Sequence, residues 1–219
     1  MEPIRTFSGH FVQARNLTQV EFFDSLEKND VIFYLGPAGT GKTFAAIAAA
    51  VSLLRDKKIR KIVLTRPAVE AGEKLGFLPG TYEEKLDPYL RPLYDALDYL
   101  LGAVRRQELI EQNIIEIAPL AYMRGRTLEK AFIVLDEAQN CTYNQLKLLL
   151  TRLGKQSKCV ITGDPGQSDI KNQSALITAH HIFGNIPGIK LIQSTEEDVV
   201  RHNLVRRILR AYDNFESRA

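Results

Sequence analysis

The sequence predicts an α/β domain in which a mostly parallel sheet is covered by helices on both faces. Short apolar runs alternate with helical patterns along the chain, which is typical of this class. The runs are almost continuously apolar, as expected for strands buried on both sides. We expect strands at residues 31–35, 61–65, 131–135 and 158–162, and weaker ones at 114–117 and 189–192. The length of 219 residues and a hydrophobic fraction of 45% suit one domain over residues 1–219, with 1–15 as a peripheral segment.

Three segments between these strands have helical patterns. Residues 44–54 are rich in alanine and apolar on nearly all sides, which predicts a buried helix packed against the sheet. Residues 87–101 begin with Asp-Pro, a favourable cap and first turn, and place leucines on one face. Thr142 and Gln145 form a capping-box pattern ahead of a third, leucine-rich helix. We interpret the second and third helices as scaffold.

The composition excludes several classes of protein. Lys and Arg number 29 and Asp and Glu number 26, so the net charge of +3 permits nucleic-acid binding without requiring it. The two cysteines, Cys141 and Cys159, are too few for a disulfide framework or a cysteine metal cluster. No apolar run approaches the roughly 20 residues of a transmembrane helix, and the first residues lack the order of a signal peptide. We therefore expect a soluble, cytoplasmic protein with no membrane partner.

The strongest functional signal is a glycine-rich loop between the first clear strand and the alanine-rich helix. Strand, loop and helix in this order are the context that a phosphate-binding loop requires. The glycines allow successive backbone N–H groups to converge on phosphates near the positive end of the helix. The loop consists of Gly36, Pro37, Ala38, Gly39, Thr40, Gly41, Lys42 and Thr43. We expect Lys42 to reach the β- and γ-phosphates of a nucleoside triphosphate and Thr43 to ligate Mg²⁺.

Two acidic residues follow the apolar run at 131–135. Asp136 and Glu137 would lie at the carboxyl end of that strand, which is where parallel sheets bind ligands. We expect Asp136 to hold Mg²⁺ through its water shell, and Glu137 to orient and deprotonate the attacking water. The alternative is a solvated acidic loop, which matches poorly because the preceding run is so apolar.

Two weaker candidates would complete the site. The turn Gly-Asp-Pro-Gly-Gln at 163–167 follows another strand and would present Gln167 at the same sheet edge, as a sensor of the γ-phosphate. Taken alone, such a segment is more often only a tight turn. Gln19 precedes the first clear strand, and its amide offers both a donor and an acceptor to adenine.

The carboxyl-terminal segment predicts a helix that begins at a Thr195 cap and runs to about Tyr212. Its apolar residues fall on one arc, and Arg201 points into that arc. A buried guanidinium needs an anionic partner, because an unpaired charge is costly to bury. The partner of Arg201 is either a carboxylate of the same subunit or the γ-phosphate of a nucleotide, which a neighbouring subunit could hold.

Several ordered motifs give the chain a specific resemblance to a known family. They are GPAGTGKT at 36–43, LTRPAV at 64–69, GEKLGFLPG at 72–80, MRGRT at 123–127, LDEAQN at 135–140, GDPGQ at 163–167 and DVVRHNLV at 198–205. With this combination the chain resembles the PhoH-like ATPases from Gln19 onward. The resemblance implies a single RecA-like P-loop NTPase domain, related to superfamily-one helicases, in which ATP hydrolysis is coupled to RNA or single-stranded DNA.

The same resemblance implies roles for individual residues. The adenine reader is Gln19, the phosphate loop is 36–43, the magnesium and water pair is Asp136 and Glu137, the γ-phosphate sensor is Gln167, and the arginine finger is Arg201. Helicases supply that finger from a second motor domain, for which this chain is too short. A homo-oligomeric ring, which we expect to be a hexamer, would let Arg201 or its neighbour Arg206 act in trans. We expect no nuclease activity, because the RNA-cleaving PIN domain of some relatives is not part of this sequence.

Arginines beside predicted strand ends are the candidate contacts to nucleic acid. Arg66, Arg124 and Arg126 could bind phosphates, or they could equally pair with acids of the same chain. No dense cluster of basic and aromatic residues suggests base-specific readout. We therefore expect nucleic-acid binding with little sequence preference and a marked salt dependence.

The leading hypothesis is an Mg²⁺-dependent ATPase that unwinds or remodels RNA. The alternative is a nucleotide-switched binding or assembly module that unwinds nothing. A small-molecule kinase is disfavoured, because Asp136 and Glu137 pair a metal ligand with a water activator and the sequence offers no evident acceptor lid.

Overall fold

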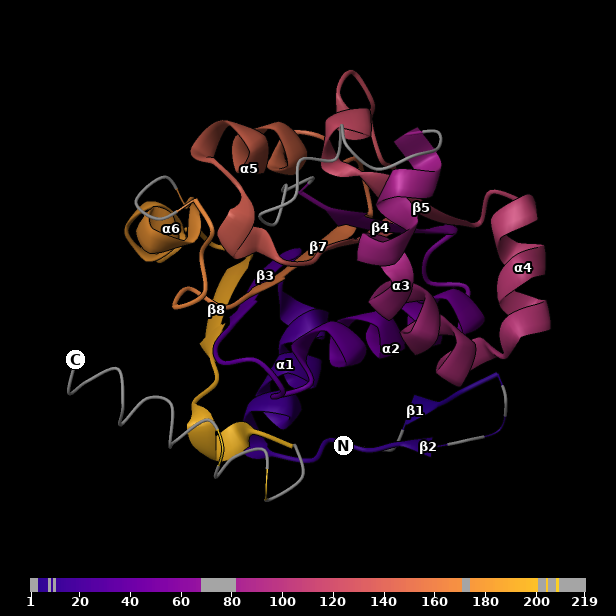
Figure 1. Cartoon of the computed structure of the whole chain (residues 1–219), viewed down its shortest axis with the longest axis horizontal. Helices are drawn as coiled ribbons and strands as arrows, with labels where there is room; N and C mark the ends of the chain where they lie inside the picture. Colours follow the sequence, from indigo (N-terminus) through magenta and orange to yellow (C-terminus); the bar gives the residue numbers. More distant parts are fainter. Residues whose placement is uncertain are drawn as a thin grey trace.

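A six-stranded sheet lies at the centre of the molecule (Figure 1). The computed structural model describes residues 4–7, 9, 11–67, 82–170, 174–200, 204 and 208. The strands pair in parallel in the order β5-β4-β6-β7-β3-β8. They are β3 (Val31–Leu35), β4 (Lys61–Arg66), β5 (Ile115–Pro119), β6 (Ala131–Leu135), β7 (Lys158–Gly163) and β8 (Ile189–Gln193). All six predicted strands are therefore confirmed, with small differences at their ends.

Helices cover both faces of this sheet (Figure 1). One face carries α1 (Leu17–Lys28), α2 (Lys42–Arg55), α3 (Tyr82–Leu101) and α4 (Ala103–Glu111). The other carries α5 (Tyr143–Leu150) and α6 (Leu176–Phe183). No described helix combines the length and the apolar character that a membrane span requires. The predicted α/β class, with a parallel sheet between two helical layers, is confirmed.

A short ribbon of chain precedes these elements. The strands β1 (Ile4–Arg5) and β2 (Phe11–Val12) pair antiparallel outside the main sheet. Ile4 is buried and belongs to the same apolar cluster as α1 and α2. This amino-terminal segment therefore contributes a side chain to the core.

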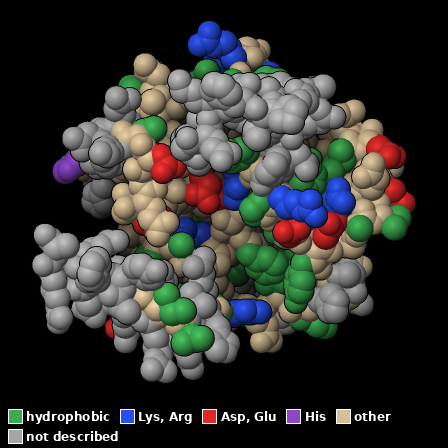
Figure 2. Space-filling model, in the orientation of Figure 1, with side chains coloured by type: hydrophobic (Ala, Val, Ile, Leu, Met, Phe, Trp, Pro, Cys, Tyr) green, Lys and Arg blue, Asp and Glu red, His purple; other side chains and the backbone are tan. Residues whose placement is uncertain are grey.

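The carboxyl ends of β3, β6 and β7 meet at one edge of the sheet, where the loop 36–43 leads into α2. Backbone hydrogen bonds join neighbouring segments at this edge. The Gly36 N–H donates to the Gly163 carbonyl at 3.0 Å, and the Asp136 N–H donates to the Thr65 carbonyl at 2.9 Å. On the face drawn in Figure 2 the surface is hollowed near the centre, with charged side chains on one rim and hydrophobic side chains on another.

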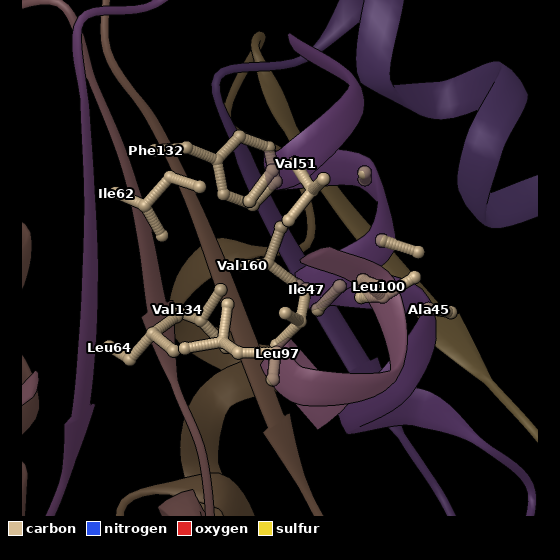
Figure 3. Packing of buried hydrophobic residues seen from close by; sticks show 14 of the residues in the cluster. Ala45, Ile47, Val51, Ile62, Leu64, Leu97, Leu100, Phe132, Val134 and Val160 are labelled. Carbon is tan, nitrogen blue, oxygen red and sulfur yellow. The ribbon is translucent and has the colours of Figure 1, made fainter. Parts of the chain in front are cut away.

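The alternation of side chains along each strand divides the core in two. Successive residues of a strand point to opposite faces of the sheet, so Ile32 belongs to the cluster with α2 whereas Phe33 belongs to the cluster with α5. Figure 3 shows the first cluster, in which strand residues Ile62, Leu64, Phe132, Val134 and Val160 pack against Ile47, Val51, Leu97 and Leu100 of α2 and α3. Because both faces of the sheet are covered, the sequences of its strands are almost continuously apolar.

The predicted start of α3 is wrong. We expected this helix to begin at Asp87, but it begins at Tyr82 and contains Pro88 and Pro92. A proline inside a helix costs about 3 kcal/mol, and each fully buried leucine contributes about 1.5–3 kcal/mol. Leu93, Leu97 and Leu100 are fully buried and Leu90 and Leu101 are buried as well, and together these leucines offset the cost of both prolines.

The helix α1 was not predicted from the sequence, although its start is recognisable. Asn16 caps it, and its Oδ1 accepts a hydrogen bond from the Gln19 N–H at 2.8 Å. An Asn three residues ahead of a Gln is the signal that could have revealed this helix. The helices α4 and α6 are also absent from the predicted set.

The predicted helix from Thr195 is wrong in its first turns. The capping box at Thr195 is present, but it starts only a short 3₁₀ turn, Glu196–Asp198. Val199 has an extended backbone, and the Val200 N–H donates to the Gly39 carbonyl at 2.9 Å instead of continuing a helix. A cap satisfies the first N–H groups of a turn, whereas packing decides whether a helix continues.

Candidate nucleotide-binding site

The loop between β3 and α2 has a backbone shape that favours glycine. Gly36, Gly39 and Gly41 have positive φ angles of 136°, 86° and 81°. A Cβ atom at Gly36 would lie 2.2 Å from Ser194 Oγ, so a side chain there would collide. Gly41 is the N-cap of α2, whose first N–H groups have no partner within the helix. The loop therefore forms the start of a helix that is suited to bind an anion.

Lys42 is held inside the curl of this loop. Its Nζ donates to the carbonyl oxygens of Gly36 at 2.6 Å and Pro37 at 2.7 Å. The residue is only 7% exposed, yet it lines the cavity described below. The backbone thus fixes a positive charge beside the N–H groups at the start of α2.

Asp136 accepts hydrogen bonds from three different strands or helices. Its Oδ1 accepts from Thr43 Oγ1 of α2 at 2.7 Å and from Thr162 Oγ1 of β7 at 2.6 Å. Its Oδ2 accepts from Arg66 Nε of β4 at 2.9 Å and also from Arg66 Nη2. Hydroxyl and carboxylate oxygens are the ligands that Mg²⁺ prefers. The adjacent oxygens of Thr43 and Asp136 therefore fit the metal that the sequence predicts.

Glu137 stands beside this carboxylate in an uncommon backbone conformation, with φ of +56°. Its side chain is 47% exposed, and Oε1 lies 3.8 Å from Arg66 Nη2. Gln139 donates from Nε2 to Glu137 Oε2 at 2.5 Å, and its Oε1 accepts from the Asp164 N–H at 3.1 Å. The sequence predicted no role for Gln139, which lies two residues after Glu137. It links Glu137 to the turn after β7.

A cavity of about 620 Å³ contains most of these groups, and we call it the polar cavity. Its described lining includes Lys42, Thr43, Arg66, Asp95, Asp136, Glu137, Asp164 and Gln167. Gln167 is exposed and closes a tight turn, in which its N–H donates to the Asp164 carbonyl at 3.0 Å. The structure therefore places the sequence candidates Lys42, Asp136, Glu137 and Gln167 around one cavity.

A second cavity, of about 580 Å³, shares Gly39, Gly41, Phe44 and Tyr99 with the first, and we call it the aromatic cavity. The rest of its lining consists of Phe11, Val12, Gln13, Ala14, Arg15, Gln19, Phe23, Ala45 and Val200. The Phe44 and Tyr99 rings meet edge to face with centroids 5.5 Å apart. This shape and composition suit a flat, largely apolar group such as a nucleobase.

Gln19 lies between the aromatic cavity and the loop. Its Nε2 donates to the Thr40 carbonyl at 2.9 Å, and its Oε1 accepts from the Arg15 N–H at 2.9 Å. The residue is 6% exposed. An amide has one further donor and one further acceptor position, so these two bonds orient Gln19 and leave it able to contact a base.

Two of the three arginines predicted to contact nucleic acid pair with acids of the same chain. Arg66 binds Asp136, as described above. Arg126 donates to both oxygens of Glu116, at 2.5 and 2.7 Å, and this pairing holds the pKa of Glu116 down at about 2. Arg124 is exposed. For Arg66 and Arg126, pairing with an internal acid is the arrangement observed.

Arg201 and Arg206 lie outside the described residues. The described chain before them contacts the phosphate loop twice. Ser194 Oγ lies 3.3 Å from Thr40 Oγ1, and the Val200 N–H binds the Gly39 carbonyl. The segment after β8 is therefore in direct contact with the loop.

Comparison with known proteins identifies close relatives of this chain. A family model described as PhoH-like protein matches residues 11–213. The PhoH-like protein of Bacillus subtilis is 52% identical over 214 residues, which cover 97% of this chain and 67% of the relative. That of Mycobacterium tuberculosis is 52% identical, over 95% of this chain and 60% of the relative. Protein PhoH of Escherichia coli is 42% identical, over 92% of this chain and 58% of the relative. The chain thus spans about three fifths to two thirds of these relatives.

Solved structures show weaker similarity. A Pyrococcus furiosus Hef helicase domain matches with a TM-score of 0.46 and 16% identity, over 81% of this chain and 37% of that one. A Sulfolobus solfataricus SWI2/SNF2 ATPase core in complex with dsDNA matches with a TM-score of 0.43 and 18% identity, over 81% and 37%.

Proposed function

The chain belongs to the PhoH-like protein family, and from this premise and the geometry of its site we propose that it is an Mg²⁺-dependent ATPase. The observation that carries the proposal is the meeting of Thr43, Asp136 and Thr162 at the ends of three elements, beside Lys42. A phosphate loop alone binds a triphosphate. A carboxylate bonded to the hydroxyl of that loop provides a metal site as well.

The residues of the polar cavity would have separate roles in binding the metal, binding the phosphates and activating water. Thr43 and Asp136 would hold Mg²⁺, which when bound neutralises charge on the phosphates. Lys42 and the N–H groups at the start of α2 would bind phosphate oxygens. Glu137 would accept a proton from the attacking water, and Gln139 would keep its carboxylate in place through the 2.5 Å bond. Gln167 would contact the terminal phosphate from the turn after β7.

The base would occupy the aromatic cavity. It lies next to the loop and shares Gly39 and Gly41 with the polar cavity, so one nucleotide could extend from one to the other. Gln19, already oriented by Thr40 and Arg15, would read adenine with its remaining donor and acceptor.

We further propose that hydrolysis is coupled to RNA or single-stranded DNA. The exposed Arg124 follows the turn Leu120–Met123, in which Tyr122 is 52% exposed, at the carboxyl end of β5. An arginine and an aromatic ring at one place suit a phosphate and a stacked base. Assembly into a homo-oligomeric ring, a hexamer, with Arg201 acting in trans, belongs to this finer proposal.

A nucleotide-switched module is the second candidate, and one observation favours it. Ser194 and Val200 contact Thr40 and Gly39. A change in the conformation of the loop would therefore alter the position of the segment after β8. Such a device could control assembly or partner binding without unwinding.

The two candidates differ in how nucleic acid affects turnover. ATP hydrolysis is measured with and without single-stranded RNA or DNA, for the wild type and for Arg124→Ala. We expect at least about tenfold stimulation in the wild type and a weaker one in Arg124→Ala, because loss of a phosphate contact weakens binding. Arg60→Ala is the control, because Arg60 is an exposed arginine just before the amino end of β4, away from the carboxyl strand ends that form the site. A wild-type rate that nucleic acid leaves unchanged contradicts the coupling and supports the switch.

A further inference from the structure

Arg66 occupies a position in the polar cavity that the proposed roles leave unused. It is the last residue of β4, the strand that pairs with β6 next to Asp136. Its Nε and Nη2 donate to Asp136 Oδ2, and its Nη1 donates to the Tyr89 carbonyl of α3 at 2.5 Å. The side chain is 13% exposed, so the guanidinium is largely withdrawn from water.

The charges around the polar cavity make this arginine important. Among the described residues that line it, the cations are Lys42 and Arg66, whereas Asp95, Asp136, Glu137 and Asp164 are acids. Lys42 is held within the loop by carbonyl oxygens. Arg66 is bonded to Asp136, and its Nη2 lies 3.8 Å from Glu137 Oε1. It is the positive charge next to the two carboxylates that the proposed function assigns to metal and water.

A bound metal ion would weaken the ion pair between Asp136 and Arg66. Oδ1 and Oδ2 of this carboxylate are both occupied, the first by Thr43 and Thr162 and the second by Arg66. A divalent cation held by Thr43 and Asp136 would neutralise the carboxylate and repel the guanidinium, since like charges at short range oppose each other strongly where water is scarce. A terminal phosphate offers the guanidinium an alternative partner, because two parallel N–H groups match two phosphate oxygens.

We propose that Arg66 is an arginine that recognises the terminal phosphate in cis. In the free protein it pairs with Asp136, and in the loaded site it turns to the γ-phosphate, where it favours ATP over ADP. This inference rests on the proposed nucleotide binding. It also means that the site contains its own phosphate-binding arginine, whether or not a neighbouring subunit adds Arg201.

The test compares two ligands that differ in the terminal phosphate. Binding of the non-hydrolysable β,γ-imido analogue of ATP and of ADP is measured, each with Mg²⁺, by displacement of a fluorescent nucleotide. In Arg66→Ala we expect the ratio of the two affinities to shift toward ADP at least tenfold relative to wild type. Arg66→Lys should restore part of the ratio, because it keeps the charge without the paired N–H groups.

Arg126→Ala is the matched control, because Arg126 also makes two bonds to one carboxylate, Glu116, but lies outside the polar cavity. It should leave the ratio unchanged. An equal loss of affinity for both ligands in Arg66→Ala overturns the proposal, since it would mean that Arg66 only supports Asp136. If Arg66→Ala does not fold, the ratio of the two affinities is measured in Arg66→Lys instead. A ratio in Arg66→Lys equal to that of the wild type also overturns the proposal. A wild type that binds neither ligand refutes the proposed function itself.

Discussion

The polar cavity and the aromatic cavity are neighbours, but they are built in different ways. In the polar cavity nearly every functional group is bonded to another one, as Asp136 is to Thr43, Thr162 and Arg66. In the aromatic cavity most of the lining side chains are apolar, with the exposed Gln13 and Arg15 beside them, and Phe11 and Tyr99 are more than half exposed. Gln19 is the buried polar side chain among its described lining residues, and it is bonded to the loop.

This difference indicates which cavity should contribute more to the affinity and selectivity of nucleotide binding. Buried charged groups such as Asp136 and Arg66 depend on accurate geometry, so loss of one group leaves its partner unpaired. Apolar contacts are non-directional and tolerate a change in the ligand. We therefore expect large effects from substitutions in the polar cavity and smaller ones in the aromatic cavity.

The largest effect should follow removal of the loop lysine. Lys42→Ala should reduce the affinity for ATP at least about 10³-fold, since two charge-assisted hydrogen bonds to phosphates are worth roughly 4 kcal/mol together. The measurement is a titration with fluorescent ATP. Lys147→Ala, which removes an exposed lysine from α5, is the control and should bind normally. Unchanged affinity in Lys42→Ala would contradict the assignment of the polar cavity to phosphates.

Glu137→Gln should separate binding from turnover. We expect hydrolysis to fall roughly 10²-fold, because a general base contributes at least that much, while the affinity for ATP changes little. Steady-state rates and the same titration measure the two quantities. Glu27→Gln, an exposed position on α1, serves as the control. Normal turnover in Glu137→Gln would remove this residue from the mechanism.

Tyr99→Ala tests the other cavity. The affinity for ATP should fall about five- to tenfold, because stacking of a base on an aromatic ring is worth roughly 1–3 kcal/mol. Binding of inorganic tripolyphosphate, which has no base, should not change. Tyr143→Ala removes a similarly exposed ring on α5 and should affect neither ligand. A parallel loss for both ligands would mean that Tyr99 supports the loop rather than a base.

The ion pair of Glu116 with Arg126 is also an arginine–carboxylate pair, but it lies away from both cavities. The pKa of Glu116 is lowered from 4.5 to about 2, first by its hydrogen bond from Arg126 and also by Lys61, against the opposing effect of burial. Because the folded-state pKa is the lower one, the pair stabilises fully above pH 4.5 and loses this contribution as the pH falls toward 2.

Glu116→Gln should therefore lower the free energy of unfolding by about 1 kcal/mol at pH 7, a modest value because the pair is partly solvated. The difference from wild type should shrink below pH 4.5. Urea unfolding at pH 7 and pH 3.5 measures it, and ATP binding at pH 7 should stay unchanged. A difference that does not depend on pH would show that the charge of Glu116 is not its source.

Local patterns were sufficient for the sheet and for part of the site. The runs at 31–35 and 131–135 became β3 and β6 with the same bounds, because a strand buried on both faces is apolar throughout. The capping box at Thr142 starts α5 as expected. The helix start at Asp87 was wrong, because burial of the leucines of α3 in the core offsets the local cost of Pro88 and Pro92 inside the helix.

By itself the sequence determined the α/β class, the phosphate loop and the acidic pair, since each depends on residues adjacent in the chain. Only the tertiary structure decided the partners of these groups. Arg66 lies 70 residues from Asp136, and Thr162 lies 26 residues from it, yet all three meet because parallel strands end at one edge of the sheet. Arg66 and Arg126 each bind a carboxylate, but the tertiary structure places Asp136, the partner of Arg66, in the polar cavity and leaves Glu116, the partner of Arg126, outside it.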